Sequence, residues 1–107
     1  MFREVMFVVS LIPAIASAEQ WIGYTKITAL YPANDGMVFL VAEPHPEVSS
    51  CDGGRRLQIP LTHPNYNAMV STLIMAFTTS KEVYLNVSTE KLKNPICAAP
   101  INRFMVK

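Results

Sequence analysis

One stretch of helical periodicity interrupts a chain that is otherwise patterned for short strands. Beyond Pro64, which suits a first helical turn, apolar side chains recur at intervals of three and four residues. They are Tyr66, Met69, Val70, Leu73, Ile74 and Phe77. The pattern predicts one helix that Thr62 or His63 caps and that ends near Thr79 and Ser80, with this stripe against the core.

Two strands joined by a hairpin are expected before this helix. Residues 21–31 are rich in aromatic and β-branched side chains, and their apolar alternation changes parity near Gly23. A bulge or strong bend would produce that change. Asp35 and Gly36 form a hairpin signal, and a second strand follows over residues 37–42.

Three further strands complete the predicted set. After a loop over residues 43–55, the alternation of residues 56–61 predicts a half-buried strand. Its inward side chains are Leu57, Ile59 and Leu61, and its outward ones are Arg56 and Gln58. Beyond the helix we expect a strand over residues 83–88, a polar loop over residues 88–96 and a last strand over residues 101–106.

The resulting order is β-β-β-α-β-β, which favours an all-β domain with one helix. This is the order of an OB-fold, a five-stranded Greek-key barrel with its helix between strands three and four. In that barrel strands three and five run parallel and adjacent, so their first residues lie together.

The N-terminal 18 residues have the layout of a secretory signal peptide. Arg3 precedes an apolar run over residues 7–15, and the small residues Ala16, Ser17 and Ala18 follow. The run is shorter than the roughly 20 residues that span a bilayer, so we expect no stable membrane anchor. Cleavage after Ala18 would leave one domain, residues 19–107, exported to the periplasm or secreted.

Two cysteines, Cys51 and Cys97, fit an exported chain, because such chains usually pair an even number of cysteines. Each precedes one of the two strands expected to run parallel, so the predicted fold brings them together. A metal site of two thiols, with only His45 and His63 to help, has no recognised ligand spacing. The sequence therefore predicts a disulfide and no metal or other cofactor.

The mature chain would open with Trp21-Ile22-Gly23, and residues 76–83 read Ala-Phe-Thr-Thr-Ser-Lys-Glu-Val. In these features and in its cysteine positions the chain resembles small exported bacterial OB-fold proteins of unassigned function. Their helix ends in Ala-x-x-[Ser/Thr]-x-Lys-x-Val, a pattern that residues 76–83 match. Residues 78–83 are also similar to the B subunit of subtilase cytotoxin, a pentameric OB-fold sugar binder. The resemblance implies the fold and, by analogy, glycan or protein binding, but the toxin's sugar-contacting residues have no match here.

No enzyme is expected, because no nucleophile–base pair or phosphate-binding glycine loop is present. A net charge of +1 and the export signal argue against nucleic acid as a partner. OB-folds bind through strands two and three and the adjoining loops, here residues 32–36 and 88–96. The candidate ligand-binding residues are Tyr24, Tyr31, Arg56, Gln58 and Tyr84. The tyrosines would stack on a sugar or peptide, or alternatively pack the barrel.

The predicted helix also carries no charged residue from Asn65 to Thr79. Its second face holds small or weakly polar side chains, Ala68, Ser71, Thr72, Met75 and Ala76. A surface helix normally sets charges opposite its apolar stripe. This face is therefore a candidate interface for a homo-oligomer or a protein partner, and the alternative is an uncharged helix exposed to solvent.

Overall fold

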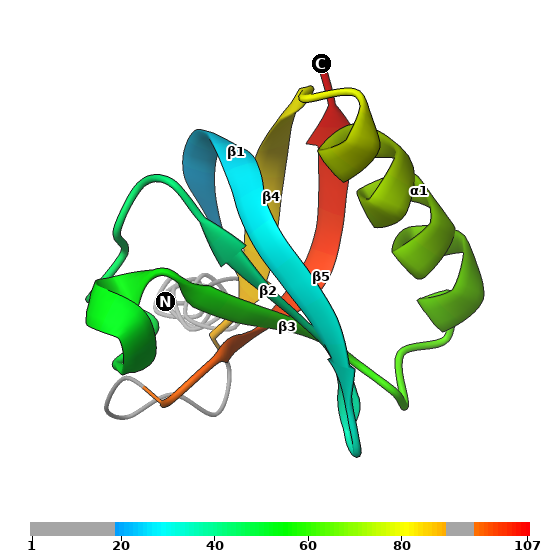
Figure 1. Ribbon diagram of the computed structural model, residues 1–107. Coiled ribbons are helices and arrows are strands. Elements are labelled where there is room, and N and C mark those ends of the chain that lie inside the picture. Colours follow the sequence, from blue (N-terminus) through cyan, green and yellow to red (C-terminus); the bar gives the residue numbers. More distant parts are fainter. Residues whose placement is uncertain (1–18, 90–95) are drawn as a thin grey trace, which may run out of the picture.

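A computed structural model describes residues 19–89 and 96–107 of the chain (Figure 1). The predicted signal peptide and residues 90–95 of the predicted polar loop lie outside these residues. The described part confirms the predicted β-β-β-α-β-β order. Its elements are β1 (Glu19–Ala33), β2 (Gly36–Val41), a 3₁₀ turn η2 (Cys51–Gly54), β3 (Arg56–Pro60), α1 (Tyr66–Thr78), β4 (Glu82–Ser88) and β5 (Ala99–Val106).

The five strands form one closed sheet in the order β1-β2-β3-β5-β4, with β4 returning to β1 (Figure 1). β3 and β5 pair in parallel, as predicted, and the other neighbours pair antiparallel. The parallel seam joins Leu57 to Ala99 and Gln58 to Pro100. Helix α1 contacts β1, β3 and β5, and so lies beside this seam (Figure 1).

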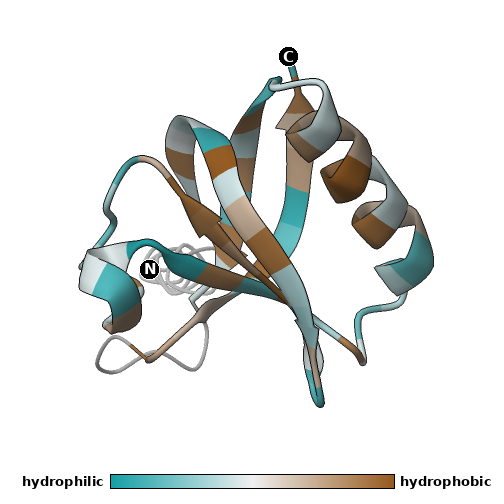
Figure 2. Ribbon diagram, in the orientation of Figure 1, coloured by the Kyte–Doolittle hydropathy of each residue, from teal (hydrophilic) through white to brown (hydrophobic). Residues whose placement is uncertain are grey.

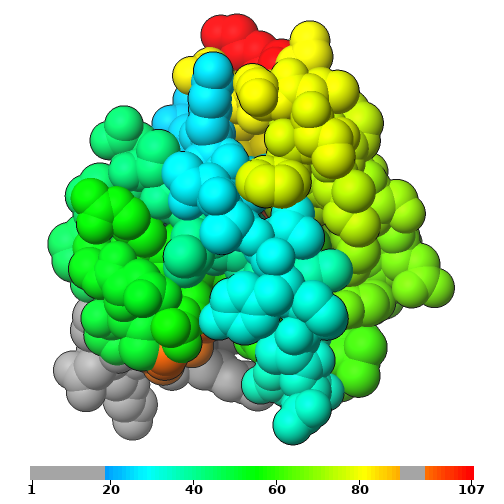
Figure 3. All heavy atoms as spheres, viewed as in Figure 1, coloured from blue at the N-terminus to red at the C-terminus, as the bar shows by residue number. Residues whose placement is uncertain are grey.

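β1 closes the sheet because it bends and pairs along its length with two different strands. Its first part pairs with β4 and its second part with β2. The register with β4 shifts between Trp21 and Tyr24, which confirms the predicted irregularity at Gly23. That glycine has a φ of +97°, which residues with a side chain rarely adopt. Figure 3 shows β1, in blue and cyan, running between the green β2–η2 region and the yellow end of α1.

The core fills the inside of this sheet with alternate side chains from the strands. Figure 2 shows hydrophobic residues concentrated along β2 and in bands across α1. The largest fully buried side chains include Phe39, Leu57, Ile59, Leu73 and Leu85. The inward alternation predicted for β3 holds for Leu57 and Ile59. It fails for Leu61, which lies beyond Pro60 at the end of the strand and is 55% exposed.

The helix faces the core along a narrower line than its stripe predicts. Met69, Leu73 and Ala76 are buried, whereas Ile74 and Phe77 are 40% and 38% exposed. The prediction was therefore wrong in turning Ile74 and Phe77 inward and Ala76 outward. A single line of side chains at i, i+4 and i+7 suffices to pack α1 on the barrel, and the small Ala76 allows a close approach.

Both ends of α1 lie close to the predicted positions. Thr79 is the C-terminal cap, as the change of pattern predicted. At the other end Asn65 takes the capping position, so the helix begins slightly later than a cap at Thr62 or His63 predicts. His63 instead contributes its ring, because Nδ1 accepts from the Asn65 backbone N–H at 3.0 Å and Nε2 lies 2.8 Å from the Asn102 carbonyl oxygen.

The predicted disulfide joins Cys51 to Cys97, with 4.7 Å between their Cα atoms. Cys51 opens η2, just before β3, and Cys97 lies just before β5. The bond therefore clips the chain where the two parallel strands begin, which is the place that the predicted topology required.

Candidate functional site

An open groove of about 430 Å³ lies on the outside of the sheet, across β1, β2 and β3. Cross-strand register explains its floor, because Tyr31 pairs with Val38 and Val38 with Gln58. Residues directly opposite one another point to the same face of a sheet. Arg56 lies two residues before Gln58 and shares that face. The groove is lined by Tyr31, Ala33, Asp35, Val38, Arg56, Gln58, Ile96, Cys97 and Ala98.

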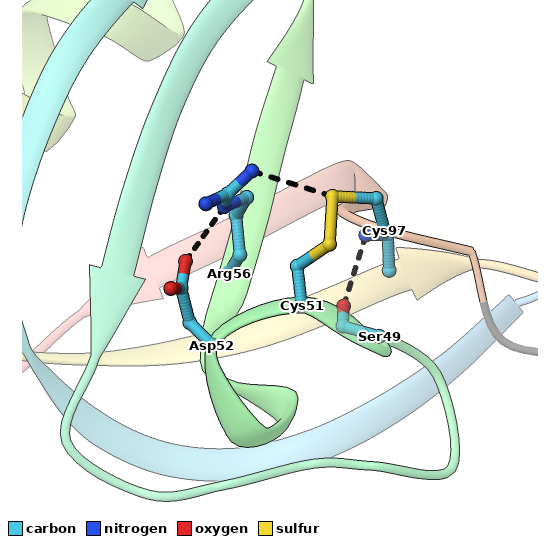
Figure 4. A network of polar contacts seen from close by, with 6 residues as sticks. Ser49, Cys51, Asp52, Arg56 and Cys97 are labelled. Carbon is cyan, nitrogen blue, oxygen red and sulfur yellow. Dashed lines mark hydrogen bonds and ion pairs between the residues drawn. A yellow bond between two sulfur atoms is a disulfide. The ribbon is translucent and has the colours of Figure 1, made fainter.

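Hydrogen bonds hold four polar side chains in and beside this groove, and Figure 4 shows those made by Arg56. The Gln58 Nε2 donates to Asp35 Oδ1 at 2.8 Å, which ties β3 to the β1–β2 turn. The Arg56 Nε donates to Asp52 Oδ2 at 2.7 Å, and its Nη1 to Cys97 Sγ at 3.3 Å. An amide, a carboxylate and a guanidinium therefore meet in fixed orientations beside the exposed ring of Tyr31.

Arg56 forms an ion pair with the neighbouring carboxylate of Asp52. The hydrogen bond to Asp52 raises the pKa of the Arg56 guanidinium above its already high ordinary value. Because this side chain lies in water, the pair contributes little to stability. The main effect of the pair is to orient Arg56, so that its Nη1 points toward the disulfide.

The other two candidate tyrosines lie elsewhere, in a stack of rings across β1 and β4. The Tyr84 ring lies between Trp21 and Tyr24, with centroid distances of 4.7 and 4.6 Å and interplanar angles of 21° and 17°. Arg103 lies over Trp21 at 5.6 Å from its centroid, and the Nζ of Lys107 lies over Tyr24 at 4.7 Å. Two rings occupy the two faces of Tyr84, and a cation lies over each outer ring. This stack thus resembles a cross-strand packing device more than an open platform.

The structure thus brings together Tyr31, Arg56 and Gln58 and places Tyr24 and Tyr84 apart from them. Asp35 and Ile96 also line the groove, although the sequence reasoning did not single them out. Each belongs to one of the two loops expected to flank an OB-fold ligand site. That position in the predicted fold was the one sequence feature that could have identified them. Trp21 was also not singled out. It pairs with Asn86 next to the register shift, and its ring stacks on that of Tyr84.

Of the predicted interface residues, Ser71 and Met75 lie on the outer side of α1. Ala68 and Thr72 line a pocket with Asn102, Arg103 and Phe104 of β5. Ala68, Ser71 and Met75 are exposed, and Thr72 is half-buried with its hydroxyl donating to the Ala68 carbonyl oxygen at 2.8 Å. Ile74 and Phe77 add exposed apolar surface next to them. The outer face of the helix is therefore more apolar than the sequence reasoning expected.

Within residues 19–89 and 96–107, no group of three or more histidine, cysteine or acidic side chains is placed to hold a metal ion. His45 lies beside Glu47, with 3.5 Å between Nδ1 and Oε2, and both ring nitrogens of His63 contact backbone groups. Over the same residues, no helix has the length and apolar character to cross a membrane.

No family model, curated protein or solved structure matches the chain.

Proposed function

We propose that this protein is an exported, non-enzymatic binding module that holds a glycan in the groove of Tyr31, Arg56 and Gln58. The observation that carries the proposal is the convergence of these three side chains with Asp35 around one concave surface. Sugar sites combine an aromatic ring, which packs on the apolar face of a pyranose, with planar polar groups that bond its hydroxyls. The groove offers one ring, one amide, one carboxylate and one guanidinium.

The internal contacts of the groove support this use. The bonds from Gln58 to Asp35 and from Arg56 to Asp52 hold long side chains in one rotamer before any ligand arrives. Less conformational entropy is then lost on binding, which favours a small polar ligand that offers few apolar contacts. We therefore prefer a glycan to a peptide as the occupant.

A glycan array probed with the wild-type protein and two variants tests the proposal. Tyr31→Ala removes the ring of the groove, and Tyr24→Ala removes an equally exposed ring of the stack, since the two are 42% and 44% exposed. We expect glycan binding that Tyr31→Ala abolishes and Tyr24→Ala retains. Loss with Tyr24→Ala alone would move the site to the stack, and no binding to any glycan would remove the proposal.

We further propose that the closed sheet is an OB-fold and that the protein is exported by its N-terminal signal peptide. The parallel seam between β3 and β5 and the helix between β3 and β4 support this topology. Glu19, the first residue after the expected cleavage site, pairs with Ser88 in the sheet, and its carboxylate lies 2.8 Å from the Arg103 guanidinium. Intact mass spectrometry of the exported protein should give residues 19–107 less two hydrogens. A mass that retains the leader would contradict export by this signal.

A second candidate function is that of an accessory subunit that docks through α1. The exposed apolar side chains Ile74, Met75 and Phe77 on an uncharged helix favour it. Its partner would be a second copy, as in the pentameric toxin subunits that part of the chain resembles, or another protein. This role and the glycan site use different surfaces, so they are compatible.

A further inference from the structure

The two sulfurs of the disulfide differ in their surroundings. Cys97 is exposed and lines the groove, whereas Cys51 is half-buried at the start of η2. The Nη1 of Arg56 donates to the Sγ of Cys97 at 3.3 Å, as Figure 4 shows. The more exposed cysteine is therefore also the one whose sulfur lies beside a positive charge.

The chain around the disulfide is held by non-covalent contacts as well as by the bond. The backbone N–H groups of Ser50 and Cys51 donate to the carbonyls of Ile96 and Cys97, at 2.8 and 3.2 Å. The hydroxyl of Ser49, a fully buried residue, accepts from the Ala99 N–H at 2.9 Å. These bonds join the two segments at the cysteines and next to them, so they would keep the two cysteines close together after the covalent bond breaks.

We propose that the Cys97 sulfur is a site of thiol–disulfide exchange with small aliphatic thiols such as glutathione. The thiolate attacks Cys97 Sγ and forms a new S–S bond to it, while the Cys97–Cys51 bond breaks. The electron pair leaves on the Cys51 sulfur, which takes a proton from water. A second thiolate then attacks the small-thiol sulfur of this mixed disulfide. The bond to Cys97 breaks, Cys97 leaves as a thiolate, and the symmetrical disulfide of the small thiol forms.

The guanidinium favours this step through charge. It attracts the attacking thiolate toward Cys97 in the first exchange. In the second exchange it stabilises the negative charge that leaves on the Cys97 sulfur. Asp52 lies on the Nε side of Arg56 and holds it in place, while Nη1 faces the sulfur. Asp35 is the other charged side chain that lines the groove. Arg56 and Asp52 are positioning residues in this scheme, and Cys97 is the reacting one.

The test measures reduction of the native disulfide by glutathione at neutral pH in the wild type, Arg56→Gln and Arg56→Lys. Circular dichroism first establishes that all three are folded. We expect the rate of reduction to rise linearly with thiol concentration. The rate should fall about threefold in Arg56→Gln, which is the size expected for the effect of an exposed charge. Arg56→Lys keeps a positive charge and should largely restore the rate. Peptide mapping after an acid quench should find the first glutathione adduct on Cys97.

Three results would each overturn the proposal. The first is an adduct on Cys51 in place of Cys97. The second is an Arg56→Gln rate equal to that of the wild type. The third is a rate that stops rising with glutathione concentration, because reduction would then require prior opening of the fold. None of these outcomes depends on which ligand the groove binds.

Discussion

At Gly36 the backbone of β2 approaches β3 too closely for any side chain. A Cβ built there collides with the carbonyl oxygen of Ile59, and the residue has a φ of +153°. Asp35 precedes it, and its own carbonyl oxygen accepts from the Leu61 N–H at 2.9 Å. This glycine therefore fixes the turn that carries Asp35 toward Gln58, and so shapes one wall of the groove.

We expect Gly36→Ala to lower the free energy of unfolding by about 3 kcal/mol, since it adds a backbone collision to an unfavourable φ. Gly53→Ala is the matched control. Gly53 also has a positive φ, of +67°, but its added Cβ would meet only the mobile end of Arg55. That variant should lose about 1 kcal/mol. Urea unfolding measures both, and equal losses would contradict the close approach at Gly36.

Single residues also show where reasoning from the sequence succeeds. Arg56 and Gln58 were predicted to share an outward face because strand alternation is rigid, and they do. Asp35 was not singled out, because a turn has no periodicity that ties it to a partner on a distant strand. Asn86 alternates with the apolar Leu85 and Val87, a pattern that turns it away from the core, yet it is fully buried. Asn86 pairs with Trp21 on one neighbouring strand and with Arg103 on the other. Strand alternation alone does not show which side chains of neighbouring strands will cover such a residue.

At the scale of elements, β1 and β4 are joined by more than their backbone ladder. The stack of Trp21, Tyr84 and Tyr24 links the two strands on the outside of the sheet. Aromatic pairs of this kind contribute roughly 0.5–1.5 kcal/mol each beyond the area they bury. The central ring takes part in two of them.

Tyr84→Ala should therefore lower the free energy of unfolding by about 2 kcal/mol, because it breaks both ring contacts. Tyr31→Ala removes an exposed tyrosine of β1 that lies in the groove and outside this stack. It should lower the free energy of unfolding by under about 1 kcal/mol. Thermal or urea unfolding of the two variants makes the comparison. A loss in Tyr31→Ala as large as that in Tyr84→Ala would show that the stack does not join the strands.

The outer face of α1 is the second element with a testable role. If it docks a second copy, Ser71→Glu combined with Met75→Glu should convert an oligomer to a monomer, since two charges would be buried against an apolar surface. Both positions are exposed, so the fold should be retained. Size-exclusion chromatography with light scattering measures the mass. A wild-type monomer at high concentration would contradict self-association through this face.

Helical register shows why periodicity alone misplaces such faces. A broad apolar stripe contains two lines of side chains, one through Met69 and Leu73 and one through Val70, Ile74 and Phe77. The sequence cannot say which line meets the barrel when both are apolar. The close approach permitted by Ala76 decides it, and that depends on the shape of the sheet beneath.

At the scale of the whole molecule, the disulfide closes the weakest seam of the sheet. β3 and β5 pair through only two residue positions each, and the Cys51–Cys97 bond lies next to them. The predicted element order and the expected export together predicted this bond. Both expectations come from sequence patterns that can be read along the chain, namely the hydrophobic periodicity and the N-terminal signal. The groove could not be predicted in the same way, because its residues come together only through the register of three separate strands.

We expect the double variant Cys51→Ala and Cys97→Ala to lose about 4 kcal/mol of unfolding free energy, on the entropic estimate for a loop of 46 residues. Its circular dichroism should remain that of the folded protein at low temperature, because the backbone bonds between the two segments persist. Urea titration of the variant and of the oxidised wild type gives the difference. A change under about 1 kcal/mol would mean that the seam holds without the clip.

The binding of a sugar in the groove is tested most directly by amide chemical-shift mapping of the isotopically labelled protein against a panel of monosaccharides. We predict that shift changes gather at Tyr31, Asp35, Arg56 and Gln58, across the outer face of β1, β2 and β3. Shift changes confined to the Trp21–Tyr84 stack or to α1, or none with any sugar, would contradict the account.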